Sequence, residues 1–359
     1  MRTVSVHTAM RSYDVVIGGG VLDRLGELWR PSVGAGRAVV CSDENVAPLY
    51  LDRVRAALAG ADVATEAVVV PPGEREKSLA TLERLYDSFY DRALTRDDAV
   101  VALGGGVVGD LAGLAAATYQ RGVRLVQAPT TLVAMVDASV GGKTAVDFRD
   151  GKNYVGAFYQ PWLVAADLDT LATLPAREVG CGWAELVKHG FLMGGEAFDD
   201  LEREAVAGAQ PSAALVTESV RFKAAVVVRD EREVSGERAI LNLGHTVGHA
   251  VEAATGFSRY RHGEAVALGL RATLWLSQRL SGLEAAAAER GQELLSRLGL
   301  PERLEGAAPA AVAALVARDK KAAGGAVRFV LLPDFGRPLA GQEVTIELRR
   351  EVLEWLAER

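Results

Sequence analysis

Three of the five histidines in this chain lie close together in its C-terminal half, at His245, His249 and His262. His245 and His249 are spaced i, i+4, so a helix would place both on one face. Neutral imidazole is a good zinc ligand, and such a pair is either a metal site or a structural pair. The HExxH motif of metalloproteases is absent, because no glutamate follows His245 directly. The third histidine and the surrounding glycines favour a metal site.

A catalytic zinc ion normally has three protein ligands and one open position, so a carboxylate from another helix could complete the set. Glu185 is the candidate. It is spaced i, i+3 from Lys188, so the two side chains would share a helix face. On these residues alone they could equally form a surface ion pair, which contributes little to stability.

A glycine-rich loop with the pattern GxGxxG runs from Gly104 to Gly109, directly after the apolar run 99–103. Glycines at the end of a strand let the backbone approach a pyrophosphate, and the amides of the following helix favour the anion. The alternative is a plain tight turn. The usual acid about 20 residues downstream is missing. Asp43, at the end of the strand predicted at 37–41, could accept hydrogen bonds from a ribose or could cap a helix.

Cations recur in the glycine-rich and apolar segments of a chain whose net charge is −7. This pattern favours an internal site for phosphate or carboxylate groups. The cations concerned are Lys143, Lys152, Lys188, Lys223, Arg238 and the pair Lys320-Lys321.

Composition narrows the functional classes. The chain has 359 residues, 49% of them hydrophobic, and two cysteines that form no CxxC motif. An acidic pI of about 5.5 argues against a broad nucleic-acid-binding face. The longest run without an acidic residue, lysine or arginine, at 153–166, is too short to span a bilayer. We therefore expect a cytoplasmic protein with no membrane or nucleic-acid partner.

Strands and helices alternate in the first half of the chain, which predicts a doubly wound α/β domain of the Rossmann type. After Pro175 helical patterns dominate, so we expect a mostly α-helical second domain and place the domains at residues 1–175 and 176–359. The predicted strands are 4–6, 13–17, 37–41, 64–70, 99–103, 124–128 and 162–166. The predicted helices of the second domain are 183–191, 211–228, 245–254, 262–280, 284–298 and 309–318.

A series of long motifs, in order along nearly the whole chain, resembles those of the 3-dehydroquinate synthases in the sugar-phosphate cyclase superfamily. They are GGGVVGD at 104–110, PTTL at 129–132, DASVGGKT at 137–144, GKN at 151–153, AELVKHG at 184–190, DERE at 230–233, LNLGHTVGH at 241–249, HGE at 262–264 and DKK at 319–321.

The resemblance implies an enzyme that uses NAD and Zn²⁺, with Co²⁺ as a further candidate metal. It would convert 3-deoxy-D-arabino-heptulosonate 7-phosphate to 3-dehydroquinate and phosphate, a step of the shikimate pathway and of aromatic amino-acid biosynthesis. Such a lyase oxidises the substrate transiently, eliminates phosphate, reduces the intermediate again and closes the carbocycle by an intramolecular aldol reaction. The resemblance also implies a homodimer, in which Arg121 contacts the phosphate bound by the neighbouring subunit.

The resemblance assigns residues to each role. The metal ligands would be Glu185, His245 and His262, so His249 would contact the substrate phosphate instead of pairing with His245 on the metal. The other substrate and catalytic residues would be Asp137, Lys143, Asn153, Lys188, Lys223, Arg238, Asn242, Lys320 and Lys321. The NAD contacts would be Asp43, Asn45, Glu74, Lys77, Gly105, Gly106, Val107, Asp110, Thr130, Thr131, Lys152 and Thr173.

Tyr159 stands where the family often has histidine, and a second departure from the family pattern bears on the substrate. The segment between Asp230 and Asn242 is one residue longer than usual, which bears on the roles of Lys223 and Arg238.

A sister cyclase that makes a valiolone or deoxy-inosose ring is one alternative, although Lys223, Arg238 and Asn242 favour an acidic substrate. A polyol dehydrogenase that uses NAD and a metal is another, and the phosphate-type cations argue against it. A non-catalytic NAD-binding protein is a third, and the intact metal-ligand set argues against it.

Overall fold

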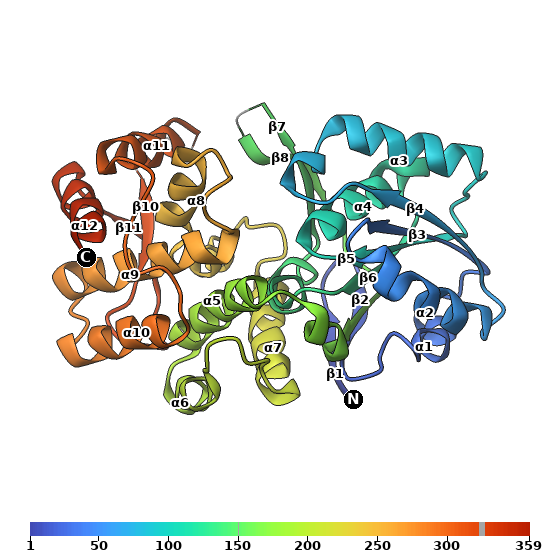
Figure 1. Ribbon diagram of the computed structural model, residues 1–359, viewed down its shortest axis with the longest axis horizontal. Helices are drawn as coiled ribbons and strands as arrows, with labels where there is room; N and C mark the ends of the chain where they lie inside the picture. The colour runs from blue at the N-terminus through green and yellow to red at the C-terminus, as the bar shows by residue number, and fades with distance from the viewer. Residues whose placement is uncertain (150, 323–326) are drawn as a thin grey trace. The chain divides into compact units, whose positions relative to one another are not determined.

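The structure, a computed structural model, describes residues 1–149, 151–322 and 327–359, with the backbone alone at 318–322. The chain divides into two units (Figure 1). Unit 1 comprises Met1–Leu174 and the later segment Lys223–Arg232, and unit 2 comprises Pro175–Phe222 and Glu233–Arg359. The sequence analysis did not place the later segment with unit 1.

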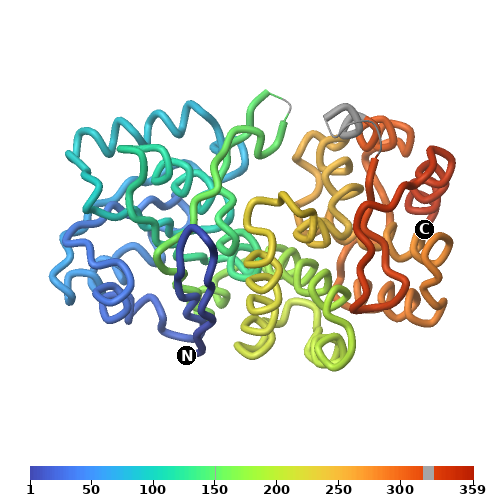
Figure 2. The backbone as a smooth tube through the Cα atoms, turned by 180° about the vertical axis from the view of Figure 1, so that it is seen from behind, coloured from blue at the N-terminus to red at the C-terminus, as the bar shows by residue number. Residues whose placement is uncertain are grey.

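Unit 1 is built on a seven-stranded sheet with the order β1-β2-β9-β6-β5-β3-β4. The edge strand β1 and its neighbour β2 form an antiparallel hairpin at the N-terminus (Figure 2), and the remaining neighbours pair in parallel. The carboxyl ends of these parallel strands therefore share one edge of the sheet, where α/β proteins bind ligands. The strands are β1 (Arg2–His7), β2 (Ser12–Gly18), β3 (Arg37–Asp43), β4 (Ala64–Val70), β5 (Ala99–Gly104), β6 (Arg124–Pro129) and β9 (Leu163–Asp167).

Helices cover both faces of this sheet, because successive residues of a strand point to opposite sides. On β3, Val40 joins a core with α1 and α2, whereas Val39 joins a second core with α3 and α4. Both valines are almost fully buried. The apolar strands are thus explained by burial on two faces. The helices are α1 (Leu25–Ser32), α2 (Ala47–Ala59), α3 (Leu79–Asp91) and α4 (Gly106–Thr118).

Shorter elements complete unit 1. An antiparallel hairpin, β7 (Lys143–Phe148) and β8 (Gly151–Phe158), forms a separate two-stranded sheet. The sequence analysis did not predict it. Four short helices lie at strand ends or turns: η1 (Glu74–Glu76), η2 (Tyr119–Arg121), η3 (Ala134–Ala138, a π-helix) and η4 (Leu168–Thr173).

Unit 2 is mostly helical, and α9 is its most buried helix. This helix packs against α5, α8, α10 and α12, and a small sheet of β10 and β11 joins the same core. The elements are α5 (Ala176–Met193), α6 (Gly195–Glu204), α7 (Ala213–Arg229), η5 (Glu237–Asn242), α8 (His245–Ala254), α9 (His262–Leu280), α10 (Ala285–Arg297), α11 (Pro309–Ala322), β10 (Arg328–Leu331), β11 (Leu339–Glu343) and α12 (Ile346–Glu358). Only the last residues of α7 are grouped with unit 1.

Two glycines let α9 approach its neighbours at backbone distance. A Cβ atom at Gly269 would lie 1.8 Å from the carbonyl oxygen of Gly244, the residue before α8. A Cβ atom at Gly263 would lie 2.3 Å from the Cα of Cys181 in α5. Since no side chain fits in either place, glycine is required for α5, α8 and α9 to converge.

The predicted fold class, a doubly wound Rossmann-like α/β domain followed by a mostly α-helical domain, is confirmed. Within the described residues, no helix combines the length and the apolar character that crossing a bilayer demands.

Candidate functional site

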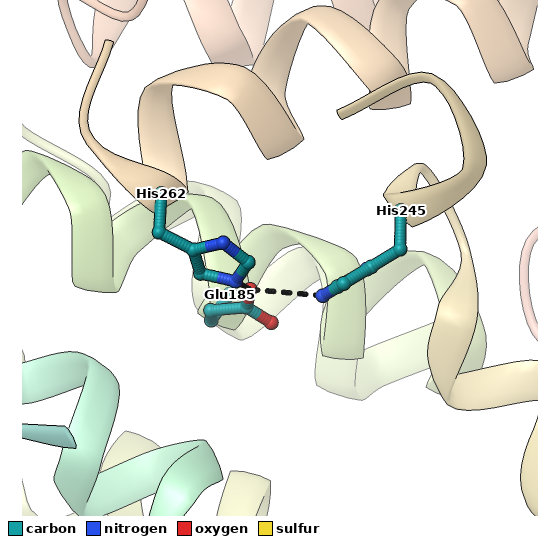
Figure 3. A group of neighbouring side chains, drawn as sticks. All are labelled: Glu185, His245 and His262. Atoms are coloured by element: carbon teal, nitrogen blue, oxygen red, sulfur yellow. Dashed lines mark ion pairs between the residues drawn. The ribbon is translucent and has the colours of Figure 1, made fainter. Parts of the chain in front are cut away.

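Glu185, His245 and His262 come together in unit 2 from three different helices (Figure 3). Each offers a ligand atom, and these atoms all lie within 4.8 Å of one another. The Nε2 atom of His245 lies 3.6 Å from Oε1 of Glu185, and the Nε2 atom of His262 lies 3.4 Å from the same oxygen. Two imidazole nitrogens therefore converge on one carboxylate oxygen.

Helix geometry explains this convergence. Glu185 lies in the middle of α5, with its side chain fully buried, whereas His245 and His262 are the first residues of α8 and α9. The close backbone contacts of α9 with α5 and with the turn before α8 bring these three positions together. Among the described residues, His245 and His249 do not occur together in any group of three whose ligand atoms lie this close, although their rings make an edge-to-face contact with centroids 5.2 Å apart.

Electrostatics in this cluster are dominated by burial and by carboxylates. Burial lowers the pKa of His245 to about 3, so its ring is neutral at physiological pH. Burial also acts to lower the pKa of His262, but hydrogen bonds to Glu185 and Glu252 outweigh it and raise the pKa to about 9. Lys188 places its Nζ atom 2.6 Å from Oε2 of Glu185, and both side chains are buried.

This donor set fits a divalent transition metal such as zinc. Two imidazole nitrogens and one carboxylate oxygen are a common set of three protein ligands at catalytic zinc sites. Histidine binds a metal in its neutral form, so a cation in this cluster would displace the proton from His262. The buried carboxylate of Glu185 provides the negative charge that a buried cation needs.

In unit 1 the glycine loop lies where the sequence predicts, between β5 and α4. Gly105 is the N-cap residue of α4, in an extended conformation, and Gly106 begins the helix. A Cβ atom at Gly105 would lie 3.0 Å from the side chain of Thr131, and one at Gly104 would lie 2.8 Å from Val108. Close packing within the loop is therefore one reason for these glycines, in addition to room for a ligand.

Several of the predicted NAD contacts form ion pairs with one another. Lys77 Nζ lies 2.5 Å from Oδ2 of Asp110, and Lys152 Nζ lies 3.2 Å from Oε1 of Glu74. Burial raises the pKa of Asp110, and the neighbouring Lys77 opposes that effect. Val107 lies in the first turn of α4, between Gly106 and Asp110.

Asp43 caps the turn that leads into α2. Its Oδ1 accepts hydrogen bonds from the backbone amides of Asn45, at 2.8 Å, and Val46, at 3.0 Å. This is the capping role that the sequence left open. It engages one carboxylate oxygen, so a ribose contact through the other oxygen is compatible with it.

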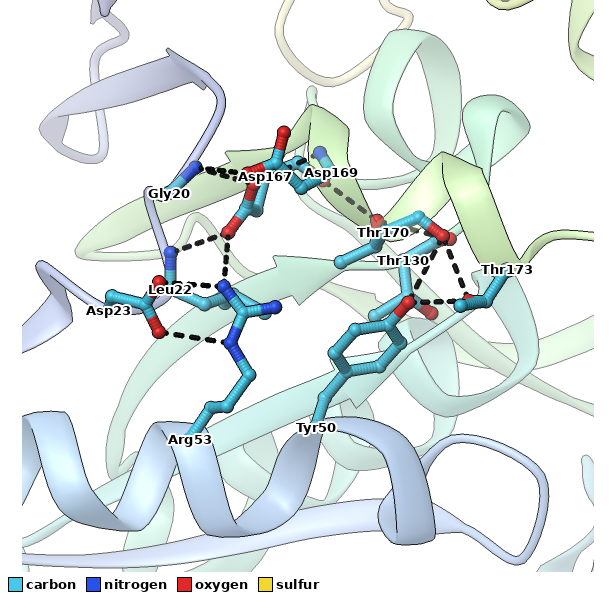
Figure 4. A network of polar contacts seen from close by, with 10 residues as sticks. All are labelled: Gly20, Leu22, Asp23, Tyr50, Arg53, Thr130, Asp167, Asp169, Thr170 and Thr173. Carbon is cyan, nitrogen blue, oxygen red and sulfur yellow. Dashed lines mark hydrogen bonds and ion pairs between the residues drawn. The ribbon is translucent and has the colours of Figure 1, made fainter.

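A polar network in unit 1 contains residues that the sequence analysis did not single out (Figure 4). The hydroxyl of Tyr50 in α2 contacts Thr173 Oγ1 and donates to the carbonyl of Thr170, 3.2 Å away. Thr170 Oγ1 in turn donates to the carbonyl of Thr130, at 3.4 Å. Tyr50 therefore connects two of the predicted NAD contacts, Thr130 and Thr173.

The same view explains the glycine cluster at residues 18–20. Asp167, fully buried at the end of β9, accepts from the backbone amides of Gly20 and Leu22 at 3.0 Å each, and Arg53 lies 3.6 Å from it. Asp169 accepts from the amide of Gly20 as well. The sequence signal that could have identified Asp167 is an acidic residue at the end of an apolar strand, the same signal that identified Asp43.

The predicted substrate residues of unit 1 fall into two groups. Lys223 Nζ lies 2.6 Å from both the backbone oxygen and Oδ1 of Asp137. Lys143 and Asn153 lie on the β7–β8 hairpin, where the amide of Asn153 donates to Asp147. Arg121 is exposed in η2.

Three of the predicted substrate residues of unit 2 lie on η5 and α8, whereas Lys188 lies on α5 beside Glu185. Arg238 is buried, and its Nε atom lies 3.7 Å from Oε1 of Glu233. Asn242 ends η5 and is exposed, as is His249 on α8. Lys320 and Lys321 fall near the end of α11, and their side chains lie outside the part of the chain that the structure describes.

Comparisons with known proteins agree with these motifs. Residues 67–181 match the family model of the 3-dehydroquinate synthase N-terminal domain, and residues 182–322 match that of the C-terminal domain. A 3-dehydroquinate synthase of Halorhodospira halophila is 47% identical over 98% of this chain and 99% of its own length. One from Caulobacter vibrioides is 46% identical, over 96% of each chain.

Solved structures of sister cyclases share the fold. A 2-deoxy-scyllo-inosose synthase, in complex with carbaglucose-6-phosphate, NAD⁺ and Co²⁺, superposes with a TM-score of 0.90 at 26% identity over 99% of each chain. A 2-epi-5-epi-valiolone synthase from Streptomyces hygroscopicus, with NAD⁺ and Zn²⁺, gives 0.88 at 30% identity over 100% of each chain. The two family models together match well over half of the chain. The two relatives with the family's name align with this chain over nearly its full length. The chain therefore belongs to the 3-dehydroquinate synthase family.

Proposed function

We propose that this protein is a 3-dehydroquinate synthase that depends on NAD and on a divalent metal, with zinc as the first candidate and cobalt as a second. It would release phosphate from 3-deoxy-D-arabino-heptulosonate 7-phosphate and form 3-dehydroquinate, acting as a carbon–oxygen lyase. The observation that carries the proposal is the ligand set Glu185, His245 and His262, in a chain whose full-length relatives bear this name.

The cofactors would supply the redox and Lewis-acid chemistry: NAD⁺ would accept a hydride from the carbon that bears a substrate hydroxyl group and return it later, and the metal would polarise the oxygen of that group. The residues of unit 2 hold the cation and bind the substrate. Glu185, His245 and His262 are the proposed ligands. The guanidinium of Arg238 can grip a carboxylate through two parallel hydrogen bonds.

The residues of unit 1 would hold the dinucleotide. The amides of Gly105 and Gly106, at the start of α4, suit the pyrophosphate. Asp43 suits a ribose. Lys223 Nζ donates to the backbone oxygen and to the carboxylate oxygen Oδ1 of Asp137, so this side chain is held in one position. Lys143 supplies a positive charge of the kind that a phosphate group requires.

The proposal is tested with purified protein, NAD⁺ and the heptulosonate phosphate. We expect one phosphate released for each dehydroquinate formed, with no net accumulation of NADH, because the cofactor is regenerated in each turnover. Removing metal with a chelator should abolish phosphate release, and adding Zn²⁺ or Co²⁺ should restore it. Net NADH production without phosphate release would indicate a dehydrogenase. Activity on glucose 6-phosphate alone would indicate a sister cyclase.

We further propose that the protein is a homodimer in which Arg121 acts on the substrate of the other subunit. Support comes from the backbone of the turn that carries it. Gln120 and Arg121 both have left-handed φ angles, 52° and 63°, which are unfavourable for residues other than glycine. Arg96 holds the turn by donating to the carbonyl of Gln120 at 2.9 Å. Strained backbone of this kind often marks a functional position.

Mixing two inactive variants tests the shared site. Arg121→Ala chains combined with His262→Ala chains should recover activity, because one of the two sites in a mixed dimer keeps an intact metal-ligand set and receives a partner's arginine. Subunit exchange is followed with two affinity tags. Verified exchange without recovery, or a fully active monomer, would contradict the proposal.

A further inference from the structure

The imidazole ring of His262 is held from both sides by carboxylates of unit 2. Its Nε2 atom faces Glu185, 3.4 Å from Oε1. Its Nδ1 atom faces Glu252, and lies 3.4 Å from both Oε1 and Oε2 of that residue. The Glu252 side chain is only 4% exposed. A buried carboxylate therefore lies directly behind one of the proposed metal ligands.

The position of Glu252 follows from helix periodicity. His245, His249 and Glu252 are spaced i, i+4 and i+7 on α8, so they share one helix face. The first turn of that face presents His245 to Glu185. Two turns later it presents Glu252 to the far side of His262, whose ring also stacks on that of His249 with centroids 5.9 Å apart.

The second proposed histidine ligand is arranged in the same way. Nδ1 of His245 lies 3.1 Å from the carbonyl oxygen of Leu243, while its Nε2 faces Glu185. A carbonyl and a carboxylate both accept hydrogen bonds, so Nδ1 carries a proton in each ring, and a cation bound at Nε2 would displace any proton there. The lone pair of a neutral ring is then on Nε2, the nitrogen directed into the ligand group.

We propose that Glu252 is a positioning residue of the metal site. Its carboxylate accepts a hydrogen bond from Nδ1–H of His262, and so fixes both the tautomer and the orientation in which Nε2 binds the cation. Carboxylates behind metal-bound imidazoles act in this way, and they make the ligand a better electron donor. This inference rests on the proposed function only in assuming that the site binds a metal, and it is independent of the substrate.

A purely structural ion pair between Glu252 and His262 is the competing explanation. It would stabilise the contact between α8 and α9 without affecting the affinity for metal. The two explanations therefore differ in metal affinity measured without substrate, and in the spectrum of bound Co²⁺.

The test uses full-length protein stripped of metal, in the wild type and in Glu252→Gln and Glu252→Ala variants. Zn²⁺ affinity is measured by competition with a chromophoric chelator, and Co²⁺ binding by visible absorption. We expect affinity about 10-fold weaker in Glu252→Gln and up to about 100-fold weaker in Glu252→Ala, with an altered Co²⁺ spectrum. Thermal unfolding in chelator reports folding separately, and the glutamine variant keeps the side-chain volume should the alanine variant fail to fold.

Glu264→Gln is the matched control. Glu264 lies in the same first turn of α9 as His262, but its carboxylate binds Arg177 and the amide of Arg261. Wild-type Zn²⁺ affinity in Glu252→Gln, or an equal loss in Glu264→Gln, would overturn the proposal. A wild-type protein that binds no metal would instead refute the proposed function.

Discussion

Replacing His262 by alanine should reduce turnover by at least about 10³-fold, because polarisation of a substrate oxygen by a metal contributes several kcal/mol to catalysis. Glu185→Gln should have an effect of the same order, since it removes the charge that balances the cation. Neither change should weaken NAD⁺ binding, because the glycine loop and its neighbours belong to unit 1. Steady-state phosphate release and calorimetric titration with NAD⁺ measure the two effects separately.

His7→Ala is the control for this experiment. His7 is an exposed histidine on β1, and its Nδ1 atom lies 3.1 Å from the hydroxyl oxygen of Ser12. Its replacement should leave both turnover and metal content at the wild-type level. Turnover of His262→Ala within tenfold of the wild type would refute the assignment of the ligand set.

Gly269→Ala should be strongly destabilising, although alanine is the better helix former. The added Cβ would lie 1.8 Å from the carbonyl oxygen of Gly244, so α9 would have to move away from the turn before α8. Overpacking of this kind typically costs about 1–3 kcal/mol, and backbone atoms cannot give way as a flexible side chain can. We expect a loss near the upper end, and weaker metal binding, because His245 follows Gly244 directly.

The measurement is urea unfolding in the presence of a chelator, so that metal binding does not contribute. Gly180→Ala is the matched control. Gly180 lies within helix α5, and in the described part of the chain no atom beyond its own turn of helix lies within 4 Å of the position that its Cβ would occupy. Its replacement should therefore stabilise the protein slightly, by up to about 1 kcal/mol. Equal effects of the two substitutions would show that helix propensity, and not the close contact between Gly269 and Gly244, decides the change in stability.

Much of the fold could be predicted because burial leaves a simple pattern. The apolar runs of β3, β5, β6 and β9 are explained by helices on both faces of the sheet, and the prediction placed all four. The β7–β8 hairpin was missed, since many of its side chains are exposed and its residues carry no continuous apolar run. Helices α6 and α12 were also missed. Their buried residues are few and lie between charged ones, as for Phe198 and Leu201 in α6.

The ligand group illustrates why local spacing is a weak guide to a site. Spacing alone pointed to His245 and His249, which share a helix face. The structure instead brings His245 to Glu185, sixty positions earlier in the sequence, through backbone contacts at Gly244 and Gly269. Such a convergence depends on tertiary packing, which the resemblance to a family could indicate and periodicity could not.

The return of Lys223–Arg232 to unit 1 has a consequence for dissecting the protein into separately expressed halves. The chain passes from one unit to the other three times, and the second passage lies inside the continuous helix α7. A fragment that ends at Leu174 would lack Lys223 and leave Asp137 without the ammonium that holds it. A fragment that begins at Pro175 would carry that segment without Met10, Asp137 and Gln160, which contact it in unit 1. Cutting the chain at one position therefore yields neither unit complete. To study unit 1 alone, Lys223–Arg232 would have to be fused to Met1–Leu174 or co-expressed with it.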